Sequence, residues 1–553
     1  MSISDPPDDS KFLSVTTAQT QRIPAILRQL SNKTLILVAL LFTIFQVTWS
    51  FRAHRLALEP DSDDDFYLCD AMRRIDVLDH QGPIPFVQGL LNKPPHSPFA
   101  TGVCLLGLLF GIQGLAGPYL VSGVLVFVLL AEANRLASDL STLARWSLLA
   151  GILLMPFTRL MVVELRPDFA VGLFGAIGSL RLVQMVLRPY RATSREIGLC
   201  SLALALTLLA KPTFFPHAII VMGLATAIPL FLRLLVDNRL SAFSWGLFLD
   251  RFKPCLWAII GCLALVIPYY FYGYRLIWDY IVQCVWGEGN WRWQVNGGMW
   301  GALQYYFSGA GADSIGSYFN LFLLIIFVGL VYLLLRHRFY QAAELIVGFL
   351  LAIASAAVII WAGIANPAFN LTAQLLLTFT AIIALNYLLA EVTWKWVQAA
   401  AALPILFIGV FQTPDPGSMD RERLANRGIT TKVVEAIESL STGNPKFPSK
   451  PIGVAMPGYA LLHDSSLWIL SHDRGFTIQA YDLGDYTDLG TVMAKMGPAD
   501  FVCLSETPNA PESFQKIQSE LFARFKSDQQ FELATRIPFG KEAIWLYKRK
   551  GSG

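Results

Sequence analysis

Long apolar runs recur along most of this 553-residue chain, and they restrict its fold more than any other feature of the sequence. A helix of about 20 apolar residues crosses the hydrocarbon core of a bilayer. Only 15% of the residues are charged, whereas roughly 25% are charged in average soluble domains. The sequence therefore predicts a polytopic α-helical membrane protein. The runs lie at 34–51, 97–115, 118–134, 146–163, 168–187, 197–210, 214–235, 255–273, 317–335, 342–363, 369–390 and 396–411.

The loops between these runs differ in charge, and the difference predicts an orientation. Cytoplasmic loops carry an excess of Lys and Arg, so we expect the basic loops and the N-terminus in the cytoplasm. Only one crossing then fits between 97 and 134, and we expect the run 97–115 to be re-entrant or interfacial. The total is about 11–13 transmembrane helices, with eleven fitting the charge pattern. The loops expected outside are 52–96, 164–168, 211–213, 274–316, 364–368 and everything after 412.

The composition changes after residue 412, where the chain becomes polar and loses its spanning runs. "IGVAMPG" and "ADFVCLSE" predict short buried strands, "PESFQKIQSELFARF" predicts an amphipathic helix, and the last twenty residues before 551 predict a hairpin. We therefore expect a cytoplasmic tail at 1–33, a transmembrane module at 34–411, and an extracytoplasmic α/β domain at 412–550. The final "GSG" is interpreted as an appended tail. His463, Asp464, Ser465 and Ser466 are interpreted as turn residues.

The densest acidic cluster follows the first apolar run closely, in "EPDSDDDFYLCD" at 59–70. Carboxylates this close together can raise one another's pKa, so that one serves as a general base, or they can hold a divalent cation. Asp63, Asp64 and Asp65 are the candidates for either role. A solvated loop is the alternative interpretation.

Three further charged motifs lie at expected helix junctions on the same side as the acidic cluster. "LLNKPPHSPF" at 90–99 holds Lys93 and His96 around two prolines, and a lysine on such a rigid turn suits a phosphate. "VVELRPDFAVGLF" carries Glu164, Arg166 and Asp168, while "LLAKPTFFPH" carries Lys211. Charged side chains at the ends of transmembrane helices need an oppositely charged partner or a water-filled cavity. The alternatives are snorkelling lysines and a short solvated loop with an Arg–Asp pair.

The order of these motifs resembles the GT-C superfamily of polyprenyl-phosphate-sugar glycosyltransferases. The motifs are an acid pair with Tyr67 just behind it, "KPP" opening an apolar helix, "RPDFAVGLF", and "LALALTLLAKPTFF". The nearest branch by this comparison holds the lipid A aminoarabinose transferases and the protein O-mannosyltransferases. The motifs cover residues 34–235, and the remainder matches in layout.

The resemblance implies roles for individual residues. Asp63 matches the acid of the reaction centre best, Asp64 matches its neighbour, and the third acid, Asp65, departs from the family pattern. Lys93 matches the lysine near the lipid phosphate. Asn92 stands where some members have an acid. The other matches are Asp168 as a second acid facing the cavity, Lys211 and Arg166 near the donor phosphate, and Tyr67 and His96 along the substrate cavity.

The expected outer loop 274–316 is rich in aromatic residues. Tryptophan and tyrosine at a membrane interface are commonly anchors. Sugars also stack on such rings, so Trp291, Arg292 and Trp293 are candidates for the substrate cavity.

These patterns together predict a bacterial inner-membrane glycosyltransferase that inverts the sugar's configuration. It would move a hexose or pentose from a polyprenyl-phosphate donor to an extracytoplasmic lipid, glycan or protein. One alternative is a polysaccharide ligase or polymerase that uses a pyrophosphate-linked donor. Another is a transporter or flippase of lipid-linked sugars, which would be expected to show an internal repeat that the sequence lacks. A net charge of +3 gives no indication of a nucleic-acid partner.

Overall fold

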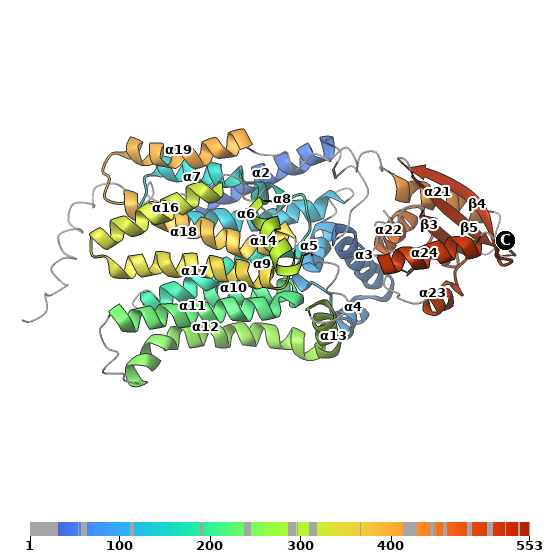
Figure 1. Cartoon of the computed structure of the whole chain (residues 1–553), viewed down its shortest axis with the longest axis horizontal. Coiled ribbons are helices and arrows are strands. Elements are labelled where there is room, and N and C mark those ends of the chain that lie inside the picture. Colours follow the sequence, from blue (N-terminus) through green and yellow to red (C-terminus); the bar gives the residue numbers. More distant parts are fainter. Residues whose placement is uncertain are drawn as a thin grey trace, which may run out of the picture. The chain divides into compact units, whose positions relative to one another are not determined.

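The computed structural model comprises two compact units, which are described separately (Figure 1). Unit 1 contains Met1–Thr43, Gly123–Met161 and Asp168–Pro414. Unit 2 contains Ile44–Ser122, Val162–Pro167 and Asp415–Gly553. The described residues are 31–53, 55–56, 63–110, 115–188, 192–236, 245–285, 295, 297–308, 318–364, 366–412, 428–442, 447, 449–456, 462–483, 489–505, 512–525, 527–539 and 542–551.

The described residues contain eight helices that are long and apolar enough to cross a membrane. Together with three shorter apolar helices, they confirm the predicted polytopic α-helical membrane fold. The eight segments are Asn32–Arg52, Ala116–Leu136, Pro167–Leu187, Pro212–Arg233, Phe252–Tyr272, Tyr318–Leu335, Phe339–Trp361 and Ala368–Leu389. The shorter ones are Pro98–Leu109, Thr142–Leu153 and Lys395–Phe411.

Two of the predicted runs differ in detail from uninterrupted spans. The run 97–115 contains α5 (Pro98–Leu109), whose 12 residues rise only about 18 Å, whereas a bilayer core is about 30 Å thick. The run 146–163 breaks into α7 (Thr142–Leu153) and α8 (Pro156–Leu160). Met155 is extended there because the residue before a proline is pushed away from the helical region.

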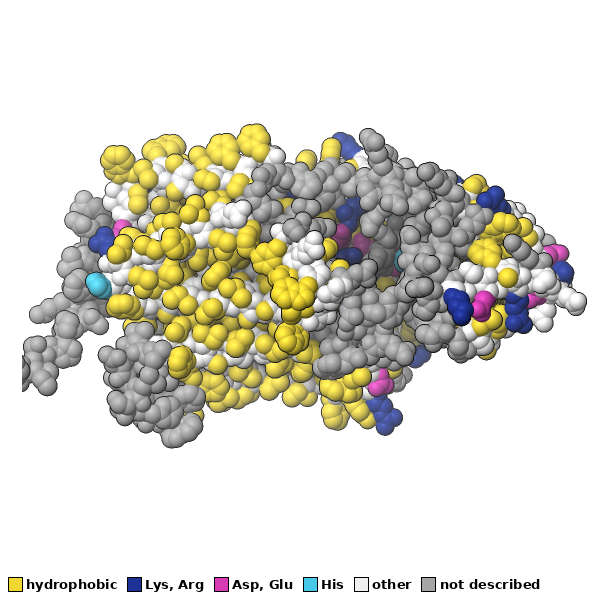
Figure 2. All heavy atoms as spheres, viewed as in Figure 1, with side chains coloured by type: hydrophobic (Ala, Val, Ile, Leu, Met, Phe, Trp, Pro, Cys, Tyr) yellow, Lys and Arg dark blue, Asp and Glu magenta, His cyan; other side chains and the backbone are white. Residues whose placement is uncertain are grey.

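The helices of unit 1 pack side by side in one bundle (Figure 1). α7 packs on α19, α10 on α12, α11 on α17, and both α16 and α17 on α18. Hydrophobic side chains cover the visible face of α16 and α17, as a lipid-facing surface requires (Figure 2). The remaining bounds in this unit are α9 (Pro167–Leu187, shared at its first residue with unit 2), α10 (Ser194–Ala210), α11 (Phe215–Val236), α12 (Trp245–Tyr272), α13 (Tyr274–Val285), α14 (Gly298–Ser308), α16 (Tyr318–Leu335), α17 (Phe339–Trp361), α18 (Leu371–Leu389), α19 (Lys395–Gln412), and the 3₁₀ turns η3 (Pro212–Phe214) and η6 (Pro367–Asn370). Two helices, α2 (Asn32–Arg52) and α6 (Ala116–Leu136), begin in one unit and end in the other.

A buried ionic network joins the helices of unit 1. Glu132 of α6 accepts hydrogen bonds from Arg135 and from Arg181 of α9, the latter at 2.8 Å. Glu344 of α17 pairs with Arg188, which follows α9. Both glutamates are almost fully buried. Arg135, in the last turn of α6, and Arg188 therefore neutralise carboxylates inside the helix bundle.

Close packing of α9 on α18 depends on a glycine. A Cβ on Gly172 would lie 2.7 Å from Leu371 Cβ and 3.0 Å from its backbone carbon, whereas a Cβ on Gly223 of α11 would meet nothing within 4 Å. We expect Gly172→Ala to destabilise the fold by about 1–3 kcal/mol through overpacking. Gly223→Ala should be neutral or slightly stabilising because alanine favours a helix. Thermal unfolding of both variants in detergent checks this, and equal midpoints would contradict it.

Unit 2 contains the α/β fold predicted for the C-terminal segment, together with the helices of the expected outer loop 52–96. Its five-stranded sheet has the order β2-β1-β3-β5-β4, with β1 parallel to β2 and β3, and β5 antiparallel to β3 and β4. The strands are β1 (Ile452–Met456), β2 (Ile478–Asp482), β3 (Phe501–Ser505), β4 (Phe531–Phe539) and β5 (Glu542–Arg549). The helices are α3 (Asp63–Gln81), α4 (Pro83–Asn92), α5, α21 (Ile429–Ser441), α22 (Asp464–Asp473), α23 (Leu489–Met496) and α24 (Glu512–Phe525).

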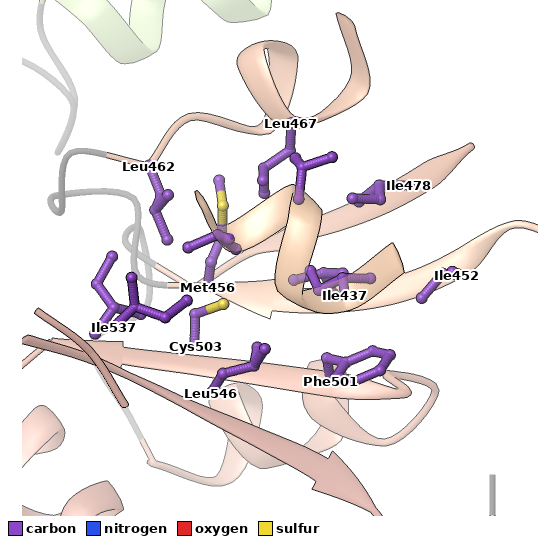
Figure 3. Packing of buried hydrophobic residues seen from close by; sticks show 14 of the residues in the cluster. Ile437, Ile452, Met456, Leu462, Leu467, Ile478, Phe501, Cys503, Ile537 and Leu546 are labelled. Atoms are coloured by element: carbon purple, nitrogen blue, oxygen red, sulfur yellow. The ribbon is translucent and has the colours of Figure 1, made fainter. Parts of the chain in front are cut away.

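One apolar core of this sheet lies between its central strands and helices α21 and α22, and another lies between the sheet and helices α23 and α24. All five residues of β1 are buried, as a central strand covered on both faces requires. Figure 3 shows Met456, Cys503 and Leu546 of neighbouring strands packed together, with Ile437 of α21 and Leu467 of α22 in the same apolar cluster. The predicted strands, amphipathic helix and closing hairpin are thereby found.

Candidate functional site

Residues 63–70 of the acidic stretch form the start of helix α3 rather than an irregular loop. Asp63, Asp64 and Asp65 are the first three residues of the helix. Carboxylates are favourable there, because the unsatisfied backbone N–H groups give the N-terminus of a helix a partial positive charge. The side chain of Asp63 is outside the described part of the structure, whereas Asp64 and Asp65 are both buried.

Asp64 is held by two donors from distant parts of the chain. The Tyr119 hydroxyl donates to Oδ2 at 2.8 Å, and the backbone N–H of Leu165 donates to Oδ1 at 2.7 Å. A carboxylate has about four lone-pair sites, so each oxygen can still accept one further hydrogen bond. Asp64 is therefore fixed in position and keeps the capacity to bind a hydroxyl.

The surroundings of Asp64 favour its protonated form. Burial raises its pKa to about 7, and the neighbouring Glu164 carboxylate acts in the same direction. The hydrogen bonds from Leu165 and Tyr119 and the charge of Arg55 lower the pKa, but they do not offset the burial. An acid with a pKa near the working pH is well matched to general base catalysis.

Glu164 pairs with two arginines beside Asp64. Arg55 forms a close ion pair with one carboxylate oxygen, and Arg166 Nε lies 3.7 Å from the other. Two guanidinium groups against one glutamate give this ion cluster an excess positive charge, although Glu164 is the member of the cluster that acts most strongly on Asp64. Arginine is well suited to binding phosphate, so the predicted phosphate role of Arg166 has a physical basis here.

Asp65 is bound by a residue of the C-terminal domain. The Ser466 hydroxyl of α22 donates to Asp65 Oδ2 at 2.6 Å. Asp64 and Asp65 thus engage different partners. No group of three or more His, Cys, Asp or Glu side chains within the described ranges is arranged to hold a metal ion. A cation at the three acids stays a prediction, since the Asp63 side chain is not described.

Tyr67 and His96, predicted along one cavity, are in contact. Tyr67 Oη lies 3.3 Å from His96 Nδ1, and the two rings stack with centroids 6.1 Å apart. Phe66 meets both rings edge to face. Tyr67 is buried, whereas Phe66 is exposed. This cluster connects α3 with the turn that follows Lys93.

The turn carrying Lys93 is tied to α3 through an arginine. Arg74 Nε donates to both oxygens of Asp70, and a second nitrogen of the same guanidinium donates to the Lys93 carbonyl at 2.9 Å. The hydroxyl of Thr101, in α5, also donates to Asp70. Ser97 caps α5 by accepting from the backbone N–H of residue 100. The backbone of Lys93 is therefore fixed while its side chain is exposed.

Asp168 and Lys211 form a buried pair inside unit 1. Lys211 Nζ lies 3.0 and 3.2 Å from the two oxygens of Asp168, and both side chains are less than 10% exposed. The ammonium also lies 4.2 Å from the centre of the Phe369 ring and 5.6 Å from that of Phe214. The resemblance implies a cavity-facing acid for Asp168 and a donor-phosphate role for Lys211, and both roles stay predictions. The structure shows that the two residues bind each other.

The structure does not test three of the predicted site residues, and it shows contact partners that the sequence analysis missed. Trp291, Arg292 and Trp293 lie outside the described residues. Asp464–Ser466 are not turn residues, since they form the first turn of α22, and Ser466 reaches Asp65. Tyr119, which binds Asp64, lies within an apolar run and carried no chemical signal in the sequence.

The fold and these two clusters define a polytopic helical membrane protein with a mixed α/β domain and with buried charges at helix ends. The chain shares this fold with ArnT from Cupriavidus metallidurans, whose apo structure matches with a TM-score of 0.55 and 12% identity. The match covers 92% of this chain and 97% of that one. The ArnT structure bound to undecaprenyl phosphate matches over the same shares with a TM-score of 0.54.

These matches show a shared fold, and the resemblance to the GT-C superfamily beyond the fold stays a prediction. No protein-family model matches the chain. No curated protein matches its sequence.

Proposed function

We propose that the chain is a membrane glycosyltransferase that moves a sugar from a polyprenyl-phosphate donor to an extracytoplasmic acceptor with inversion. The observation that carries this proposal is Asp64, a buried acid with a pKa near 7 at the start of α3, beside the arginines that bind Glu164. The fold shared with ArnT supports it, and undecaprenyl phosphate, bound in one ArnT structure, belongs to the proposed class of lipid carrier.

The proposed reaction is a single displacement at the anomeric carbon. An acceptor hydroxyl attacks that carbon while its proton passes to Asp64. The bond between the carbon and the phosphate oxygen breaks, and polyprenyl phosphate leaves with one additional negative charge. Arg166 and the exposed Lys93 are the residues proposed to stabilise that charge, because fixed cations at a developing anion are usually the largest catalytic contribution.

The remaining assignments extend the same proposal. Lys211 is assigned to the donor phosphate, and Asp168 is assigned as the second acid facing the cavity, as the resemblance implies. The protein is placed in the inner membrane, with its N-terminus in the cytoplasm and its α/β domain outside. The acceptor class is a lipid, a glycan or a protein.

Release of label from the donor tests the proposal. Purified chain in proteoliposomes would receive a panel of radiolabelled polyprenyl-phosphate sugars, with a bacterial envelope extract as the acceptor source. The proposal expects time-dependent transfer of label from one donor to an acceptor. A folded chain that turns over none of the panel would contradict it. Parallel samples with EDTA test the predicted cation: a loss of turnover that Mg²⁺ or Mn²⁺ restores would indicate a required ion.

The pH dependence of turnover follows from the pKa of Asp64. A base must be deprotonated to accept a proton, so kcat/KM should rise with pH and level off above a midpoint near 7. Below that midpoint the protonated Asp64 cannot accept the hydroxyl proton. The profile would be measured from pH 5 to pH 9. A flat profile across this range would show that Asp64 is not the proton acceptor.

A further inference from the structure

One face of α3 packs along α22 of the C-terminal domain, within unit 2. The contacting residues of α3 recur at intervals of three or four, which places them on one face of the helix. Each of them meets a residue of α22. The four pairs are Asp65–Ser466, Cys69–Ser465, Arg73–Trp468 and Asp76–His472.

The α3–α22 contact is also held together at its other end, around Arg73 and Asp76, by packing that does not involve Ser466. The Arg73 guanidinium lies 5.0 Å above the Trp468 ring, which stacks on His472 at 4.7 Å. His472 Nε2 is 3.7 Å from an Asp76 oxygen. Ile469 is fully buried in an apolar cluster that includes residues of α3. The domain is therefore anchored on α3 by the contacts of Arg73 and Asp76, about two and three turns away from Asp65.

At the start of α3, the contact with α22 is a buried hydrogen bond. The Ser466 hydroxyl lies 2.6 Å from Asp65 Oδ2, and both side chains are about 2% exposed. This distance is typical of a charge-assisted hydrogen bond between a hydroxyl and a carboxylate. Asp65 directly follows Asp64 in the first turn of α3, where a helix otherwise frays most easily. The hydrogen bond therefore fixes the turn that carries the proposed base.

We infer that the C-terminal α/β domain supplies Ser466 as a positioning residue for the acidic first turn of α3. This inference rests on the proposed function for its catalytic consequence, because Ser466 acts through Asp65 on the placement of Asp64. Docking of α22 on α3 thereby lets the α/β domain help to position the proposed base.

Hydrogen exchange and kinetics of Ser466 variants test this inference. Ser466→Ala removes the donor, Ser466→Cys keeps the volume with a weak donor, and Ser466→Thr restores the hydroxyl. Ser527→Ala is the control, since this serine of the same domain is exposed and binds only a backbone carbonyl among the described contacts. Backbone amide exchange would be measured in peptides covering 63–70 and 467–473.

We expect exchange in 63–70 to accelerate about tenfold in the Ala and Cys variants, while exchange in 467–473 stays unchanged. The kcat of donor turnover should fall about tenfold at constant KM, and Thr should restore both readouts. Unchanged exchange in 63–70 would overturn the inference, and so would equal acceleration in both segments, which would show loss of docking. Exchange needs no turnover, so inactive wild-type protein would contradict the proposed function alone.

Discussion

Asp64→Asn is expected to lower donor turnover by at least about 100-fold, because a general base typically contributes 10²–10⁴-fold to a rate. The amide has the shape of the carboxylate and can still accept the hydrogen bond from the backbone of Leu165, so the fold should persist. It cannot take the proton of an acceptor hydroxyl at neutral pH. Initial rates of label release in proteoliposomes would measure the loss.

The same helix provides the matched control for this substitution. Asp79 lies near the end of α3 and is exposed, so Asp79→Asn changes the same chemical group without touching the site. Its turnover should equal that of the wild type. Asp63→Asn and Asp65→Asn complete the series. A collapse in Asp63→Asn with normal turnover in Asp64→Asn would move the base to Asp63, as the family resemblance implies, and would refute the role given to Asp64.

Asp168→Asn is expected to destabilise unit 1 by about 3–5 kcal/mol, because removing one partner of a buried ion pair leaves a buried charge uncompensated. Asp168 is 1% exposed and is bound to Lys211 at 3.0 Å. The rings of Phe369 and Phe214, which both lie near the Lys211 ammonium, offset this loss only in part, since cation–π contacts contribute about 0.5–2 kcal/mol. Thermal and chemical unfolding in detergent would measure it.

Two further variants serve as comparisons for Asp168→Asn. Glu391→Gln breaks the exposed pairs with Arg336 and Arg338, and exposed pairs contribute only about 0–1 kcal/mol. The double substitution Asp168→Asn with Lys211→Met removes both charges and should recover most of the stability. If Asp168→Asn is no more harmful than Glu391→Gln, the pair is not buried as described. If the double variant regains stability without donor turnover, a role of the Asp168–Lys211 pair in turnover is supported.

The transmembrane elements could be predicted because every helix that spans a bilayer needs about 20 apolar residues. Apolar length alone located the long helices. The break at Met155 also had a local signal, the proline at 156. In the C-terminal domain, the amphipathic period of 511–525 and the apolar run of 452–456 were likewise local, and α24 and β1 are found there.

The partners of the site residues could not be predicted, since they come from distant segments. Asp64 is bound by Tyr119, 55 residues later, and Asp168 by Lys211, 43 residues later. A single sequence places these residues in an outer loop or near a helix end and does not show which side chain each will meet. Asp64 therefore could not be chosen among the three acids before its contacts were known.

The reading of residues 463–466 as a turn failed for a chemical reason. Aspartate and serine are common both in turns and at the first positions of helices, because their oxygens accept hydrogen bonds from nearby backbone N–H groups. The apolar residues Leu467, Trp468 and Ile469 that follow were the available evidence for a helix. The contact between Ser466 and Asp65 joins residues 401 positions apart and had no local signal.

A matched pair of donors tests the central claim most directly. One labelled sugar would be supplied on one polyprenol, linked through a single phosphate in one sample and through a pyrophosphate in the other, to wild type and Asp64→Asn in proteoliposomes. The account predicts transfer from the monophosphate donor alone, with loss of that transfer in Asp64→Asn. Transfer from the pyrophosphate donor alone would contradict it and indicate a polysaccharide ligase or polymerase. Movement of intact donor across the bilayer without transfer would likewise contradict it and indicate a transporter.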